Sequence, residues 1–300
     1  MRVKNALLTL TVISIVSFTS SNAAFGFSFK PNPTRKVTDD VGFQAFCKGE
    51  QSFVCIKDAF SESFAQDLKL DAVSLKQNDF GANNAGIAAS SSITTSMRRN
   101  VHQIWLSSPT DGSFLANVYC GNHPARQSLL SVLQHLTSEI QILAAGATAT
   151  KDTTHVQKYS RLDPTLATEL SYLCYEPGSY YQKHIDRIQH KKDDICNNIK
   201  EENRRVVSLI YYLGHGEDLS SVMYDETRDG GCLRIYESQE DPLIIYGHNN
   251  NNNNYEDKYE DVRPVANTLV LLDSASVPHE VLETFTRSRM CVVGWLHGPT

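Results

Sequence analysis

The second half of the chain contains a series of short segments that favour β-strands, and this series constrains the fold more than any other feature. Seven such runs follow residue 165: ELSYLCYE, YYQKHID, RVVSLIYYL, GGCLRIY, PLIIY, NTLVLLD and RMCVVGWL. Turn-rich or charged segments separate them, and no helical pattern lies between. Many short strands without intervening helices indicate an antiparallel sandwich or barrel. We therefore expect a mainly β fold with flanking helices.

Strand and helix patterns also occur in the first half, which predicts a supporting α/β region over residues 46–160. FVCIKDAF (53–60) and RRNVHQIWL (98–106) have strand character. Between them, residues 61–77 predict a helix with Ser61 as its N-cap, because a serine side chain can accept a hydrogen bond from the first turn.

The clearest helix is predicted over residues 128–147. Its apolar residues recur at spacings of four, three, four and three and so form one face: Leu129, Leu133, Leu136, Ile140 and Leu143. His135 lies beside this face and is interpreted as a surface residue. Two polar segments are interpreted as loops: residues 81–96, which lack an apolar period, and HNNNNNN (248–254) with the YEDKYED that follows it.

The N-terminus has the layout of a secretory signal peptide. A basic start precedes an apolar run, Ala6–Phe18, and small residues allow cleavage after Ala23 or Ala24. The run is shorter than the ~20 residues that span a bilayer, so no stable membrane span is expected after cleavage. An uncleaved anchor is the alternative. We expect a targeting peptide over 1–24, a linker over 25–45 and delivery to the secretory pathway. The AAFGF junction resembles presequences of algae with secondary plastids, so plastid delivery stays open.

Composition disfavours two classes of function. The net charge is −6 and there is no stripe of lysine and arginine, which disfavours nucleic acid as a partner. The seven cysteines include no C-x-x-C pair, which disfavours a zinc knuckle or a thioredoxin-type site. Cys174 and Cys291 lie in apolar runs and are expected to be buried thiols. One or two disulfides are possible in the secretory pathway.

The segment YYQKHID places His184 and Asp186 at alternate positions of a predicted strand, so both side chains point to one face. Lys183 is expected on the opposite face, in solvent. About one His-x-Asp/Glu match is expected by chance in a chain with 10 histidines and 34 acidic residues. A second match, His215-Gly216-Glu217, lies in a turn and is expected to be solvated. A metal site therefore needs a third ligand.

That ligand is usually a second histidine from a distant strand. The candidates are His190, His215, His248, His279 and His297. Only His279 follows a strong buried strand and a turn and then enters another apolar run. Arg289 comes ten residues later inside the last predicted strand. A buried arginine is unfavourable unless it pairs with an anion, and a dicarboxylate cosubstrate would suit its planar fork. Arg287 shares the same strand face and is the competing choice.

These residues together resemble the iron- and 2-oxoglutarate-binding set of the Fe(II)/2-oxoglutarate-dependent dioxygenases. The segments CYEPGSYYQKHID, SLIYYL, GGCLRIY, VPHEV and VVGW are similar to the prolyl 4-hydroxylase branch of that family. The resemblance covers residues ~165–298. It implies a double-stranded β-helix (jelly-roll) domain, which we place at residues 161–300.

The resemblance also implies roles for individual residues. Fe(II) would be bound by His184, Asp186 and His279, and 2-oxoglutarate by Arg289. Tyr175 resembles a tyrosine near 2-oxoglutarate, Tyr212 one that binds its distal carboxylate, and Leu233 an apolar residue of the pocket; both tyrosines can equally be core aromatics. The connection over 187–205 would cover the substrate, and a solvated surface loop is the alternative.

The reaction that the family implies uses O2 and hydroxylates prolyl residues of a protein or peptide, with release of succinate and CO2 and with L-ascorbate to restore oxidised iron. Lysyl residues or a small molecule are alternative substrates of the same chemistry. A zinc hydrolase and a non-catalytic barrel that serves as a binding module are the alternatives from other classes.

Overall fold

The structure of the protein is a computed structural model that describes residues 37–77, 83–84, 101–106, 121–148, 154–163, 169–187, 204–216, 223–237 and 258–298. The helices are η1 (Val37–Asp39), α1 (Val41–Cys47), α2 (Glu62–Gln77), α3 (His123–Thr148), α4 (Thr154–Tyr159) and α5 (Glu226–Asp229). The strands are β1 (Phe53–Ile56), β2 (Asn83–Asn84), β3 (Val101–Trp105), β4 (Leu170–Tyr175), β5 (Tyr181–His184), β6 (Arg205–His215), β7 (Leu233–Tyr236), β8 (Tyr259–Val262), β9 (Leu269–Asp273), β10 (His279–Val281) and β11 (Arg289–His297).

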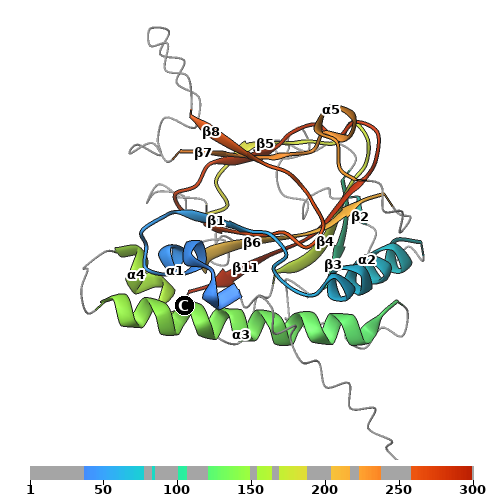
Figure 1. Cartoon of the computed structure of the whole chain (residues 1–300). Helices are drawn as coiled ribbons and strands as arrows, with labels where there is room; N and C mark the ends of the chain where they lie inside the picture. Colours follow the sequence, from blue (N-terminus) through green and yellow to red (C-terminus); the bar gives the residue numbers. More distant parts are fainter. Residues whose placement is uncertain are drawn as a thin grey trace, which may run out of the picture. The chain divides into compact units, whose positions relative to one another are not determined.

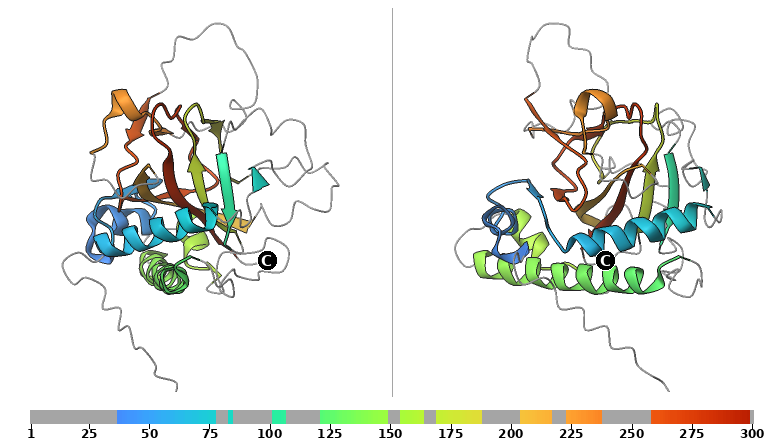
Figure 2. Two further views of the ribbon diagram at one scale, coloured as in Figure 1. Left: turned by 90° about the vertical axis from the view of Figure 1, so that its right-hand side faces the viewer. Right: turned by 45° about the vertical axis from the view of Figure 1, so that its right-hand side comes forward.

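The strands form two antiparallel sheets (Figure 1). The larger has the order β1-β9-β6-β11-β4-β3-β2 and the smaller the order β5-β10-β7-β8. Helices α1 to α4 lie on one side of the larger sheet, and the smaller sheet lies on the other side (Figure 2). This arrangement confirms the prediction of antiparallel sheets with flanking helices, and it is consistent with a double-stranded β-helix. Strands β1 and β3, from the predicted supporting region, belong to the larger sheet.

The larger sheet is buried on both faces, so the protein has a hydrophobic core on each side of it. In β9, Leu269 and Leu271 belong to the core between the larger sheet and the helices, whereas Val270 and Leu272 belong to the core between the two sheets. Because side chains alternate along a strand, a continuous apolar run such as TLVLL supplies both cores. The candidate functional residues lie beside the core between the two sheets.

The predicted helices are present with one change of boundary. Ser61 caps α2, since its Oγ accepts a hydrogen bond from the backbone N–H of Phe64 at 3.3 Å. Helix α3 begins five residues earlier than the predicted 128, at His123, where the side chain of Asn122 accepts from the N–H of Ala125 at 3.2 Å. His135 lies at its surface with 71% of the side chain exposed, as predicted. Among the described helices, none is both long and apolar enough to cross a membrane.

Three segments predicted to lack structure contain regular elements. Helix α1 begins at Val41, inside the predicted linker 25–45, because Asp40 caps it and Phe43 and Phe46 are fully buried. The tyrosine- and acid-rich sequence after the asparagine run contains β8 as an edge strand. Polar side chains suit an edge strand.

Strand β8 is fixed to β7 through its outward-facing side chains. Arg234 makes two hydrogen bonds of 2.8 Å to Asp261, and its guanidinium lies 3.8 Å from the ring centre of Tyr259. Within the predicted loop 81–96, Asn83 and Asn84 pair with β3. The other residues of that loop, residues 1–36 and the PLIIY segment lie outside the described ranges.

The cysteines in the described ranges are free thiols: Cys47, Cys55, Cys174, Cys232 and Cys291. Cys174 and Cys291 are buried, as predicted, and burial raises the pKa of the Cys174 thiol to about 12. Cys120 and Cys196 lie outside the described ranges, so the prediction of disulfides stays a prediction.

A buried ion pair joins α2 to α3 and gives a stability prediction. Asp71 lies 3.0 Å from Arg126, and both side chains are fully buried. Asp71→Ala would remove the carboxylate that pairs with the buried guanidinium of Arg126. We therefore expect the free energy of unfolding, measured by urea titration, to fall by about 3–5 kcal/mol. The matched control is Glu237→Gln, since Glu237 and Lys258 form a pair with side chains 70% and 79% exposed. No measurable change is expected there.

Candidate metal centre

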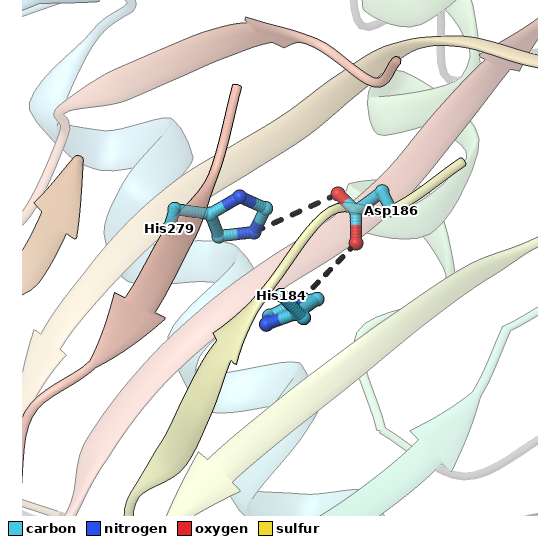
Figure 3. Close-up of side chains that lie close together, drawn as sticks. All are labelled: His184, Asp186 and His279. Atoms are coloured by element: carbon cyan, nitrogen blue, oxygen red, sulfur yellow. Dashed lines mark ion pairs between the residues drawn. The ribbon is translucent and has the colours of Figure 1, made fainter. Parts of the chain in front are cut away.

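Three side chains converge at the smaller sheet, two from adjacent strands and one from the turn that follows the first of them. His184 ends β5 and pairs across the ladder with His279, the first residue of β10, while Asp186 follows two residues after His184. One nitrogen or oxygen atom from each of the three lies within 4.8 Å of those from the others. Figure 3 shows the three side chains turned toward one another. The structure therefore brings together the three residues predicted as metal ligands.

The orientation of both histidines suits metal binding. Nδ1 of His184 donates to the carbonyl of Gln182 at 2.8 Å, and Nδ1 of His279 donates to the carbonyl of Val277 at 3.1 Å. Because a carbonyl oxygen only accepts, each ring presents Nε2 to the site. These Nε2 atoms lie 3.3 Å and 3.7 Å from the two carboxylate oxygens of Asp186. A backbone carbonyl that fixes the tautomer and the orientation of the ring is a usual support for a metal ligand.

The site favours the protonation states that a divalent metal needs. Burial alone would raise the pKa of Asp186, but His279 and His184 outweigh it and hold that pKa well below its usual range. Burial, with a contribution from His184, lowers the pKa of His279 to about 4. At neutral pH the carboxylate is thus charged and His279 is neutral, as metal ligation requires.

Arg289 supplies a buried positive charge to the same inter-sheet region. It begins β11 and is 1% exposed. Its Nη2 donates to the Tyr212 hydroxyl at 3.1 Å, whereas Nε and Nη1 have no hydrogen-bond partner among the described residues. The rings of Tyr175 and Tyr212 have centres 4.7 Å and 4.9 Å from the guanidinium carbon. A buried guanidinium with two unsatisfied N–H positions is suited to bind an anion.

The competing cation, Arg287, is engaged elsewhere. Its Nε and Nη2 donate to the two carboxylate oxygens of Asp229 at 2.9 Å and 2.6 Å, and Arg228 donates to the same carboxylate. The side chain of Asp229 is fully buried. Of the two arginines weighed from the sequence, Arg289 therefore has the N–H groups that can receive a carboxylate.

The GGCLRIY segment packs closely against Arg289. Leu233 is fully buried in the same core cluster as Tyr175 and Tyr212. Gly231 has φ +74°, and a Cβ there would lie 3.2 Å from Cδ of Arg289 and 3.0 Å from Oγ1 of Thr284. Glycine is needed at this position for both its backbone conformation and its close approach.

Two polar side chains that were predicted to be solvated are packed instead, so those predictions are wrong. His215 is 8% exposed and pairs with Arg289 across the ladder. Lys183 lies on the strand face opposite to His184, as predicted, but its ammonium contacts the ring of Tyr236 at 3.6 Å from the centre. The face of an aromatic ring attracts an ammonium charge in this position.

The other histidine candidates do not reach the metal centre or are not described. His297 is buried and its Nε2 lies 3.2 Å from Glu169, which also makes two hydrogen bonds with Arg205. His190 and His248 lie outside the described ranges, as do residues 188–203 of the predicted cover over the substrate.

Comparison with known proteins identifies the region that carries this site. Residues 170–297 match the 2OG-Fe(II) oxygenase superfamily. No curated protein sequence matches the chain. The solved structures that resemble it include a Pseudomonas putida prolyl-4-hydroxylase, with a TM-score of 0.55, 20% identity and coverage of 86% of this chain and 99% of that one.

Two further structures share the fold. A prolyl hydroxylase from Trichoplax adhaerens, in complex with a hypoxia inducible factor peptide, has a TM-score of 0.55 and 18% identity and covers 85% and 89% of the two chains. The non-heme alpha ketoglutarate-dependent epimerase SnoN from nogalamycin biosynthesis has a TM-score of 0.51 and 12% identity and covers 86% of this chain and 82% of that one. At these identities the likeness shows the fold. The region that matches the 2OG-Fe(II) oxygenase superfamily, residues 170–297, also contains the His-Asp-His cluster.

Proposed function

We propose that the protein is an Fe(II)- and 2-oxoglutarate-dependent dioxygenase that hydroxylates prolyl residues in a protein or peptide. Two histidines and one carboxylate on one face of a metal leave positions open for a cosubstrate and O2. The observation that carries the proposal is Arg289, because the same three ligands could serve a zinc hydrolase but such an enzyme has no need of a buried cation. The match to the 2OG-Fe(II) oxygenase superfamily supports both Fe(II) and 2-oxoglutarate.

Each residue then has a role in binding. Iron, when bound, supplies the oxidation, in which 2-oxoglutarate becomes succinate and CO2 and a substrate C–H bond is hydroxylated. His184, Asp186 and His279 hold the metal, and Arg289 holds the distal carboxylate of the cosubstrate. Burial raises the pKa of Tyr212, so its phenol keeps the proton and can donate it in a hydrogen bond to that carboxylate. Tyr175 and Leu233 keep water away from the pocket. L-ascorbate would return oxidised iron to Fe(II).

The choice of prolyl substrate is supported by segments around the site and by the two prolyl hydroxylase structures of similar fold. The similar fold of an epimerase from an antibiotic pathway supports the second candidate, which is the same cosubstrate chemistry on a small molecule. We further propose that residues 1–24 direct the protein into the secretory pathway, with a secondary plastid as the alternative destination.

The test is mass spectrometry of peptides after incubation with enzyme, Fe(II), 2-oxoglutarate and ascorbate. We expect proline-containing peptides to gain the mass of one oxygen atom, with fragment ions that place it on proline. Matched peptides with alanine in place of proline should be unchanged. Oxygen gained on lysine, or on no peptide while a small molecule is oxidised, would contradict the prolyl assignment and leave the cosubstrate chemistry intact.

A further inference from the structure

Arg289 lies in a row of three side chains across the larger sheet. It pairs with Tyr175 on β4 and with His215 on β6. Directly paired residues of antiparallel strands place their side chains on the same face, close together. Tyr175 and Tyr212 belong to the core between the sheets, so His215 lies on the same side of the larger sheet as Arg289, between the two sheets.

A bulge in β6 brings His215 onto this face. Tyr212 pairs with Cys291 and Gly214 with Met290, so that Leu213 is left without a partner in the register. Residues 212 and 215 would face opposite ways in a regular strand, and the extra residue reverses the second of them. Gly214 has φ +91°, which fits the distorted backbone.

His215 is buried without satisfied ring nitrogens. It is 8% exposed and its ring stacks on Tyr224 with centres 5.0 Å apart. Neither Nδ1 nor Nε2 has a hydrogen-bond partner of ordinary geometry among the described residues. Burial and the charges of Arg289 and Arg287 lower the pKa of His215 to about 4, against smaller effects of Asp229 and of the Arg287 backbone. At neutral pH the ring therefore offers one N–H donor, and leaving it unpaired in the interior is unfavourable.

We propose that His215, together with Arg289 and Tyr212, binds the distal carboxylate of the 2-oxo dicarboxylic acid cosubstrate. This inference rests on the proposed function. A carboxylate has two oxygens with about four acceptor positions, and these can receive the free N–H groups of Arg289, the Tyr212 hydroxyl and the His215 N–H. His215 thereby contributes to the preference for a dicarboxylic over a monocarboxylic 2-oxo acid.

The experiment measures binding without turnover. Anaerobic protein loaded with Mn(II) is titrated by calorimetry with 2-oxoglutarate and with 2-oxopentanoate, which has the same carbon chain but no distal carboxylate. His215→Phe keeps a ring on Tyr224 and removes the N–H. We expect its Kd for 2-oxoglutarate to rise roughly tenfold to a hundredfold, since a hydrogen bond to a charged group is lost. The Kd for 2-oxopentanoate should not change.

Two variants complete the comparison. His215→Gln, which retains a donor, should recover part of the affinity for 2-oxoglutarate. His135→Phe changes an exposed histidine of α3 and should bind both acids as the wild type does. If His215→Phe does not fold, judged by circular dichroism and Mn(II) affinity, His215→Leu is measured in its place with the same two acids.

Equal affinity of wild type and His215→Phe for 2-oxoglutarate overturns the inference. An equal loss of affinity for 2-oxoglutarate and for 2-oxopentanoate also overturns it, because His215 would then act through packing and not through the distal carboxylate. The proposed function fails separately: wild-type protein that binds Mn(II) but no 2-oxoglutarate refutes both. Wild type that binds 2-oxoglutarate, with loss in Arg289→Gln and none in His215→Phe, refutes only the role of His215.

Discussion

Replacing His279 with alanine is expected to abolish metal binding and the formation of succinate from 2-oxoglutarate. The substitution removes one of three ligands, and its partner in the ladder, His184, cannot replace it because the register fixes their separation. Loss of a residue that merely supports a ligand weakens metal binding by about 10–100-fold, so loss of a ligand should exceed that. Mn(II) affinity by calorimetry and succinate by chromatography measure the two effects.

The control for this variant is His135→Ala, which removes an exposed histidine from α3 and should leave both readouts unchanged. Circular dichroism establishes that His279→Ala is folded, which we expect because the replaced group lies at the start of a short strand of three residues. Undiminished succinate formation by a folded His279→Ala protein would show that the metal centre has been assigned to the wrong residues.

Replacing Arg289 with glutamine is expected to weaken 2-oxoglutarate binding by roughly two to three orders of magnitude while Mn(II) binding is kept. A carboxylate in the pocket would lose its charged partner in a buried setting, where such a loss costs about 2–5 kcal/mol. The affinity of Arg289→Lys for 2-oxoglutarate should lie between those of the wild type and Arg289→Gln, because lysine keeps the charge but not the planar fork. Calorimetric titration of the Mn(II)-loaded proteins gives both affinities.

Arg287→Gln is the matched control, because Arg287 lies two residues before Arg289, just ahead of β11. Arg287 neutralises the buried carboxylate of Asp229, so its loss should lower thermal stability and leave the Kd for 2-oxoglutarate within about threefold of the wild type. A larger loss of 2-oxoglutarate affinity in Arg287→Gln than in Arg289→Gln would reverse the assignment of the two arginines.

The helices and strands that could be predicted from the sequence are those with a strong apolar pattern within the element itself. The buried strands and the apolar face of α3 are such elements. Strand β8 was missed because its stability comes from pairing with β7 and from the contact of Arg234 with Asp261, 27 residues apart, and not from apolar residues. Helix α1 was missed because a short helix with two buried phenylalanines follows a polar stretch and has no long periodic pattern.

The same distinction holds for the site. The spacing of His184 and Asp186 is local to one short segment, although β5 ends at His184 and Asp186 lies just beyond it, and His279 could be chosen because it follows a buried strand and a turn. The sequence favoured Arg289 and left Arg287 as the competing choice, since the two residues have the same parity and the decisive partner, Asp229, lies 58 residues from Arg287. His215 could not be found, because one bulged residue reverses the face that the strand period assigns to it.

The central claim is that the His-Asp-His cluster and Arg289 together support Fe(II)-dependent conversion of 2-oxoglutarate. Its most direct test is the quantity of succinate formed from 2-oxoglutarate by wild-type protein with Fe(II), ascorbate and proline-containing peptides, in the presence and absence of O2. We predict succinate that requires both iron and O2 and that equals the hydroxylated product in amount. Folded, iron-loaded protein that forms no succinate, or that forms it equally without O2, would contradict the claim.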